Sequence, residues 1–224
     1  MAILGVIAAL PEEADAFFPG QGQVDDAGPL PVRRLHLGDV DMIVVVSGIG
    51  KVNAAMAATC LIFGEGCDHL LIIGTAGMIG QRAEHCFWLT SAIHHDYGAE
   101  RSDGFTHYTA GSWPLGPARV EPFMAMPDPG LGLPHARVAS GDAFVECPDY
   151  ARFLSEGLSA DVVDMETAAA AQVAKRFDLP WAGIRAVSDG ANGDSVDAFQ
   201  QNLKRAARAA GEAGERFVEL LAYP

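Results

Sequence analysis

Apolar and polar residues follow one another in blocks along this chain. Short apolar runs end at glycine, proline or acidic residues, and alanine-rich stretches with scattered charges follow them. Such runs predict buried strands, and the longer alanine-rich stretches predict helices. The expected strands cover residues 2–9, 32–37, 42–46, 69–73, 87–93, 137–140, 162–163 and 180–187.

The stretches between the strands predict helices, turns and one irregular segment. A helix is expected to open at Pro11, since proline suits the first helical turn, and residues 32–37 and 42–46 predict a hairpin. Further helices are expected over residues 52–63, 164–176 and 202–221. Residues 98–117 are rich in Gly, Tyr, Phe and Trp and are expected to form a loop. Strands separated by helices predict a mostly parallel sheet covered on both faces, in a single domain of residues 1–224.

The balance of charge and the cysteines narrow the partners of the protein. There are 29 acidic and 15 basic residues, which gives a net charge of −14. Binding to a nucleic acid needs clustered Lys and Arg, so no nucleic acid is expected. No apolar run reaches the ~18 residues of a membrane span, and the apolar start reads as a strand rather than a signal peptide. The four cysteines show no Cys-x-x-Cys spacing, and we expect a cytoplasmic protein without a membrane partner.

Glycines follow one predicted strand in the sequence Val-Ser-Gly-Ile-Gly-Lys. A phosphate-binding Walker loop needs glycine where Val45 stands and Ser or Thr where Val52 stands. A dinucleotide-binding fingerprint needs a small residue where Asn53 stands. Both phosphate-binding motifs therefore fail, and Gly48 and Gly50 indicate only that the backbone comes close to another group.

Carboxylates gather near the ends of three other predicted strands. Glu12 and Glu13 follow the first strand, where the dipole of a helix N-terminus also favours acidic residues. Asp164 and Glu166 stand at the predicted start of a helix, and Asp189 ends a nearly continuous apolar run. Burial after such a run can raise the pKa of a carboxyl group. Because ligands of parallel sheets collect at the carboxyl ends of strands, these residues are candidates for acid–base chemistry.

Two further features have alternative interpretations. The sequence His-His-Asp-Tyr places His94 and Asp96 on one face of a strand, but no third ligand stands at a suitable spacing, so no metal site is predicted. Phe144 follows a tight turn, where its ring either packs in the core or offers a stacking surface for a flat ring.

Six motifs, read together, carry a resemblance to a known family. They are ALPEEA, SGIGKVNAA, GTAG, SGDAF, DMETAA and RAVSDG, in that order. Their order and spacing resemble those of the 5′-methylthioadenosine/S-adenosylhomocysteine nucleosidases, within the superfamily of purine nucleoside and uridine phosphorylases. The resemblance implies a three-layer α/β/α sandwich with a central twisted mixed sheet. It also implies a homodimer that needs no cofactor or metal and hydrolyses the N-glycosidic bond of 5′-substituted adenosines, releasing adenine. Such substrates are 5′-methylthioadenosine, S-adenosylhomocysteine and 5′-deoxyadenosine.

The resemblance also implies roles for individual residues. Glu13 would position and deprotonate the attacking water, Glu166 would grip the ribose hydroxyls, and Asp189 would give a proton to adenine N7. Ser188 and Arg185 would hold the surroundings of Asp189. The other positions that would contact the sugar or the base are Ile49, Thr75, Ala76, Gly77, Phe144, Val145 and Met165.

The nucleophile, the substrate and the neighbouring subunit leave alternatives. Phosphorylases bring arginines to phosphate, and neither SGIGK nor GTAGMIG carries one, so water is the expected nucleophile. The alternatives are a purine nucleoside phosphorylase, a hydrolase of another purine nucleoside such as futalosine, and a nucleoside-binding protein without catalysis. In the family, the region of residues 98–117 reaches the neighbouring subunit's site. Phe105 would cap the 5′ substituent there or belong to an aromatic dimer interface.

Overall fold

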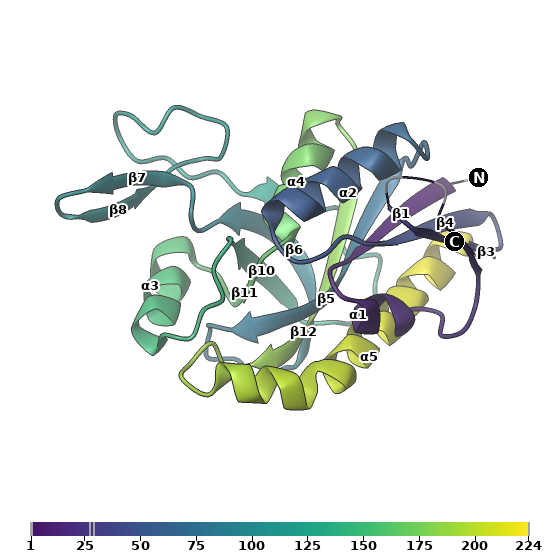
Figure 1. Ribbon diagram of the computed structural model, residues 1–224. Helices are drawn as coiled ribbons and strands as arrows, with labels where there is room; N and C mark the ends of the chain where they lie inside the picture. Colours follow the sequence, from purple (N-terminus) through teal and green to yellow (C-terminus); the bar gives the residue numbers. More distant parts are fainter. Residues whose placement is uncertain (1, 27, 29, 224) are drawn as a thin grey trace.

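The structure is a computed structural model that describes residues 2–26, 28 and 30–223 (Figure 1). The helices are α1 (Pro11–Asp15), α2 (Lys51–Phe63), α3 (Pro148–Leu158), α4 (Thr167–Arg176) and α5 (Ser195–Ala222). The strands are β1 (Ala2–Ala8), β2 (Gln23–Asp25), β3 (Val32–Leu37), β4 (Val40–Val46), β5 (His69–Met78), β6 (Cys86–His94), β7 (Gly98–Arg101), β8 (Gly104–His107), β9 (Phe123–Met124), β10 (His135–Ser140), β11 (Val162–Asp164) and β12 (Trp181–Asp189). α2 and α4 pack together on one face of the central sheet, and α5 with α1 covers the other.

The central sheet has ten strands of mixed direction. Its order is β11-β10-β6-β12-β5-β1-β4-β3-β2, with β9 paired beside β6. β1 is parallel to β4 and β5, and β5 is parallel to β12, so these carboxyl ends share one edge. β11 pairs with both β10 and β5, which closes part of the sheet on itself. The predicted α/β sandwich with a mixed sheet is confirmed, and the closure is a feature that the strand pattern did not predict.

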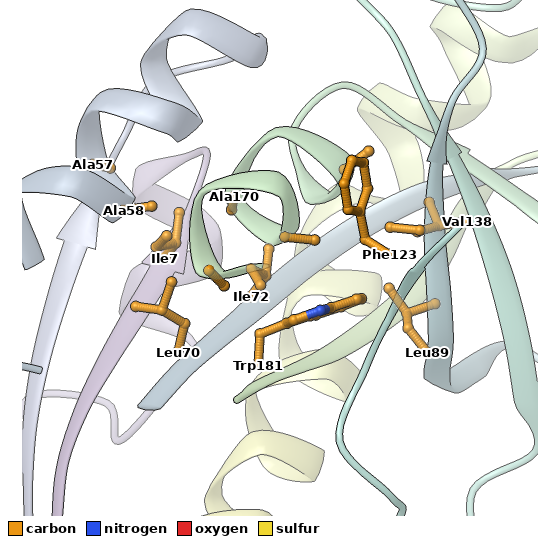
Figure 2. Close-up of a cluster of buried hydrophobic side chains, with 14 of the residues drawn as sticks. Ile7, Ala57, Ala58, Leu70, Ile72, Leu89, Phe123, Val138, Ala170 and Trp181 are labelled. Atoms are coloured by element: carbon orange, nitrogen blue, oxygen red, sulfur yellow. The ribbon is translucent and has the colours of Figure 1, made fainter. Parts of the chain in front are cut away.

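Both faces of the central strands are buried in separate hydrophobic cores. In β5, Ile72 belongs to the core beneath α2 and α4, together with Trp181 and Ala58 (Figure 2). Leu71, the preceding residue, belongs to the core on the other face with Phe217 of α5. This alternation follows from the two-residue period of a strand. Burial of one such aliphatic side chain contributes about 1.5–3 kcal/mol, so the strand ends above these cores are firmly held.

Several predicted elements have different bounds in the structure. The hairpin of β3 and β4 is confirmed, whereas residues 98–117 are only partly a loop because β7 and β8 pair as a hairpin. The helix predicted from residue 164 begins at Thr167, since Asp164 still pairs in β11. α5 begins at Ser195, before the predicted start. α3 was not predicted, although Pro148 at its start and buried residues at helical spacing mark it in the sequence.

Candidate active site

The carboxyl ends of β1, β5, β11 and β12 surround one cavity of about 300 Å³. The turn before α2, the loop after β10 and the first turns of α5 complete its lining. The predicted site residues that line it are Glu13, Ile49, Thr75, Ala76, Gly77, Phe144, Val145, Met165, Glu166, Ser188 and Asp189. Arg185 and Phe105 are the predicted residues that do not line it. Residues far apart in the sequence thus meet at the edge of the sheet where ligands of such folds bind.

Glu13 is a buried carboxylate surrounded by hydrogen-bond donors. Its Oε2 accepts the backbone N–H groups of Ala9 and Leu10 at 3.0 and 3.1 Å, where β1 turns into α1. Its Oε1 accepts the N–H and the hydroxyl of Thr75 at 2.7 and 2.9 Å. These four donors fix the carboxyl group between the end of β1 and β5. The neighbouring Glu12 is exposed and belongs to no wall of the cavity.

Arg185 lies behind the cavity wall and joins two buried carboxylates. Its Nη2 is 2.6 Å from Asp164 Oδ2 and 3.5 Å from Glu166 Oε2, and all three side chains are buried. The hydroxyls of Ser140 and Thr167 also donate to Asp164. Burial opposes the charge of Arg185, but Asp164 and Glu166 outweigh it and raise its pKa. The ion-pair partners of Arg185 are therefore these two carboxylates.

Glu166 has the most strongly raised carboxyl pKa at this site. Burial and the neighbouring charge of Asp164 raise its pKa to about 7, while Arg185 and the N–H of Gly50 oppose the rise. The Gly50 N–H donates to Glu166 Oε1 at 3.0 Å, although the two residues are far apart in the sequence. Glu166 therefore changes its charge near neutral pH, which suits a group with a functional role.

Asp189 stands at a bulge that turns its side chain into the cavity. The pairing of β12 with β5 shifts between Val187 and Asp189, and such bulges re-aim side chains. The Ser188 hydroxyl lies 2.9 Å from Asp189 Oδ2, and the Ala191 N–H donates to Oδ1 at 3.0 Å. A Cβ on Gly77 would lie 3.0 Å from Asp189 Oδ1, so glycine leaves room for this carboxyl. Asp189 and Glu13 open onto the same cavity.

The mouth of the cavity is apolar. Phe144 is 45% exposed and meets Phe199 edge to face, with 6.2 Å between the ring centroids. Val196, Phe199 and Gln200 line the cavity from one side of α5 and were not predicted as site residues. Their spacing of three and four residues is the helical signal that could have found them. Other lining residues that the prediction missed are Ala9, Leu10, Ala143 and Val163.

Phe105 lies in β8, outside the cavity of its own chain. Its ring is 4.9 Å from that of His107, within the hairpin that projects beyond α3 (Figure 1).

The structure also shows the surroundings of the His-His-Asp-Tyr sequence and the charged residues around the cavity. Among the described residues, no group of three or more His, Cys, Asp or Glu side chains is placed to hold a metal ion. Asp96 instead pairs with Lys51, whose Nζ is 2.6 Å from its Oδ1. Of the residues that the structure describes around the cavity, none is Lys or Arg.

No helix in the described part of the chain has the length and apolar character of a membrane span.

Comparison with known proteins agrees with this fold. The family model of the phosphorylase superfamily matches residues 3–219, so the chain belongs to that superfamily. A 5′-methylthioadenosine/S-adenosylhomocysteine nucleosidase of Bacillus licheniformis is 34% identical over 181 residues, which cover 75% of this chain and 76% of that protein. One of Staphylococcus aureus is 27% identical and covers 98% of this chain and 100% of its own length. Within the superfamily, the chain therefore belongs to the family of 5′-methylthioadenosine/S-adenosylhomocysteine nucleosidases.

Solved structures share the fold at lower sequence identity. A futalosine hydrolase mutant of Helicobacter pylori has a TM-score of 0.85 and 22% identity, with 98% of this chain and 99% of that one covered. The 5′-methylthioadenosine/S-adenosylhomocysteine nucleosidase of the same organism has a TM-score of 0.84 and 23% identity, with coverage of 97% and 98%. Because the two scores are almost equal, the fold alone does not separate these two activities.

Proposed function

We propose that the protein hydrolyses the N-glycosidic bond of 5′-substituted adenosines and releases adenine. The observation that carries the proposal is that Glu13, Glu166 and Asp189, from three separate segments, all line one cavity. Hydrolysis of a glycosidic bond needs a pair of carboxyl groups in different environments, since one must give a proton and the other must accept one. Membership in the nucleosidase family supports the choice of an adenosine as substrate.

Asp189 is the proposed general acid. Adenine is a poor leaving group until N7 is protonated, and a positioned acid contributes about 10²–10⁴-fold to the rate. Ser188 Oγ lies 3.3 Å from the carbonyl oxygen of Ala76 and 2.9 Å from Asp189 Oδ2. A hydroxyl has one proton to donate. Asp189 Oδ2 is the nearer acceptor, so the Ser188 hydroxyl donates to it and holds the carboxyl group in place at the cavity.

Glu13 is the proposed base that activates water. Four hydrogen-bond donors hold its carboxyl group in place, and Thr75, which supplies two of them, lines the cavity beside it. Glu166 is the proposed partner of the ribose hydroxyls, and its carboxylate also favours the positive charge that develops on the sugar. Phe144, at the mouth of the cavity, would stack on the purine.

Water is the proposed nucleophile, and phosphate is disfavoured by the charge of the site. A phosphate-binding site needs cationic or N–H donors that have no other partner. Lys51 and Arg185 each pair with carboxylates. A hydrolase of another purine nucleoside such as futalosine remains the second candidate, because the futalosine hydrolase fold superimposes equally well.

A homodimer is the proposed assembly. α2 carries Val52, Met56 and Phe63 on its exposed side, at 79%, 42% and 69% exposure. Its opposite side is already packed against α4 and the sheet. A helix that is apolar on all sides is typical of a buried position, and a second copy of the chain would cover it. Trp113 is also exposed, at 83%, and in the proposed dimer Phe105 would reach the partner's cavity. Size-exclusion chromatography with light scattering tests the dimer, and a monomer at micromolar concentration would contradict it.

The cytoplasm is the proposed location. Cys60, Cys67, Cys86 and Cys147 are all free thiols. Burial raises the pKa of Cys67 to about 12 and that of Cys86 to about 11, which keeps them as unreactive thiols. Free cysteines are usual in a reducing compartment.

The decisive experiment measures release of the free purine base from a panel of purine nucleosides, with and without phosphate. The panel contains 5′-methylthioadenosine, S-adenosylhomocysteine, 5′-deoxyadenosine and futalosine. We expect turnover of the adenosines without phosphate, and a loss of about 10²–10⁴-fold in kcat for Glu13→Gln and Asp189→Asn. Glu12→Gln is the matched control and should remain close to wild type. Turnover that requires phosphate, or nucleoside binding without any turnover, would contradict the proposal.

A further inference from the structure

Three charged residues outside the cavity join two of the segments that build it to the end of β6. Lys51 is the first residue of α2, Asp96 follows β6, and Asp142 lies in the loop after β10. Lys51 Nζ is 2.6 Å from Asp96 Oδ1, and the backbone N–H of Asp142 donates to Asp96 Oδ2 at 2.9 Å. The backbone N–H of Lys51 donates to Asp142 Oδ1 at 2.7 Å, which closes the ring.

The position of the ring makes these contacts stronger than an ordinary surface ion pair. The side chains of Lys51 and Asp96 are only 23% and 28% exposed, whereas fully exposed pairs contribute little. Burial opposes the charge of Asp96, but Lys51 and the N–H of Asp142 outweigh it and keep its pKa below the ordinary value. The Asp142 carboxylate also satisfies an N–H at the start of α2, where the helix leaves such groups without an internal partner.

Two of the three segments that the ring joins also carry residues of the cavity. Next to Lys51, Gly50 donates its N–H to Glu166 Oε1, and Ile49 lines the cavity mouth. Beyond Asp142, Phe144 lines the opposite side of the mouth. The two walls have no shared element other than the sheet, so their relative placement depends on contacts between the loops.

We propose that Lys51, Asp96 and Asp142 form a clamp, a set of positioning residues that fixes the Gly50 amide on Glu166 and holds the purine-stacking loop. This inference rests on the proposed function for its kinetic readout. Gly50 fits the arrangement, because a Cβ there would lie 3.2 Å from Asp142 Oδ1 and its φ is +102°. The clamp residues do not line the cavity themselves.

Loss of the clamp should alter the titration of Glu166. The Gly50 N–H is one of the groups that keep the pKa of Glu166 from rising further, together with Arg185. Asp164 and Glu13 are the charged groups that act in the opposite direction. If the Gly50 N–H moves away, the pKa of Glu166 rises, and the ionised form is present only at higher pH.

The test compares Lys51→Met with Lys51→Arg and with a control, Arg208→Met. Arg208 forms an ion pair with Glu212 on α5 at 2.7 Å, close to the 2.6 Å between Lys51 and Asp96. Both side chains of the Arg208 pair, however, are largely exposed. For Lys51→Met we expect kcat/KM to fall about 10- to 100-fold, as for a displacement of about 1 Å. We also expect the acidic limb of its pH profile to move up by as much as about one unit. Lys51→Arg should recover most of the rate, and Arg208→Met should match wild type.

Hydrogen exchange gives a second readout that needs no turnover. In Lys51→Met, the amides of residues 47–52 and 141–146 should exchange faster, while the strands of the sheet stay protected. Asp96→Asn should give the same pattern, which guards against misfolding of one variant. An active wild type with an unchanged acidic limb and unchanged exchange in both variants would overturn the clamp. If the wild type releases no adenine, the proposed function fails and hydrogen exchange alone decides the clamp.

Discussion

Gly74 is the glycine on which the placement of the proposed base depends. It lies within β5, next to Thr75, with a φ of +150° that side chains rarely adopt. A Cβ at this position would lie 2.6 Å from Glu13 Oε1 and 2.4 Å from Arg185 Nη1. Both groups are held by several partners, so neither moves freely away. The substitution Gly74→Ala therefore presses directly on two of the charged groups of the site.

The size of the effect follows from these distances. Ordinary contact of a Cβ begins at 3.4 Å, so Glu13 must retreat by about 0.8 Å and Arg185 by about 1 Å. Such a shift stretches the Thr75 contacts of Glu13, now 2.7 and 2.9 Å, beyond hydrogen-bond length. A displacement of about 1 Å at reacting groups costs about 100-fold in rate. Overpacking and backbone strain each add about 1–3 kcal/mol, so the free energy of unfolding should fall by about 4 kcal/mol.

A matched control separates the backbone from the contacts. Gly130 has a φ of +103° and no heavy atom within 4 Å of an added Cβ. Gly130→Ala should therefore lose only the backbone part, about 1–3 kcal/mol, with unchanged kcat. Urea denaturation and adenine release measure the two effects. A Gly74→Ala enzyme with wild-type kcat, or one no less stable than Gly130→Ala, would refute the reasoning from distances.

Three further outcomes follow from the charges and rings of the site. Arg185→Met leaves Asp164 and Glu166 buried without their cation, and urea denaturation should show a loss of about 3–5 kcal/mol. The pKa of Glu166 is about 7 in the folded chain and 4.5 ordinarily, so its protonated form stabilises the fold below pH 4.5. That contribution of roughly 3 kcal/mol is lost as pH rises through 7. A Glu166→Gln variant whose free energy of unfolding depends on pH in the same way as that of the wild type would contradict this. The ionised form gives kcat/KM an acidic limb near pH 7. Phe144→Leu should raise KM about fivefold with little change in Tm, because the ring is half exposed and stacking adds about 1 kcal/mol.

Local patterns in the sequence predicted the parts of the fold that depend on neighbouring residues. The hairpin of residues 32–37 and 42–46 could be predicted because two apolar strands flank a short polar turn. The closure of the sheet could not, since Val162 and Val163 are only two apolar residues whose pairing with β5 depends on a distant strand. The same difference explains the helix start at Thr167. Asp164 favours a helix N-terminus locally, but its pairing with β10 extends the strand.

The site residues were predicted where motifs carry them and missed where only tertiary contacts do. Glu13 and Asp189 stand in motifs at strand ends, and both line the cavity. Arg185 follows Ile184 in the strand, and this position does not predict its partners. Its side chain runs behind the cavity wall to Asp164. Phe199 lies in α5, whose start the apolar pattern predicted seven residues too late. Phe199 therefore fell outside the predicted helix, and its position at the cavity was not predicted.

The glycine-rich strand ends of this chain have carboxylates where related motifs would have a phosphate. The Gly50 N–H, which in a phosphate-binding loop would point to an anion, donates to Glu166. Gly74 and Gly77 leave room for Glu13 and Asp189. A phosphate entering the cavity would have to displace the Glu166 carboxylate from that amide and then sit among like charges, with Lys51 and Arg185 already paired. A neutral water molecule neither displaces the Glu166 carboxylate nor meets like charges. The carboxylates that shape the cavity therefore also favour water over phosphate as the nucleophile.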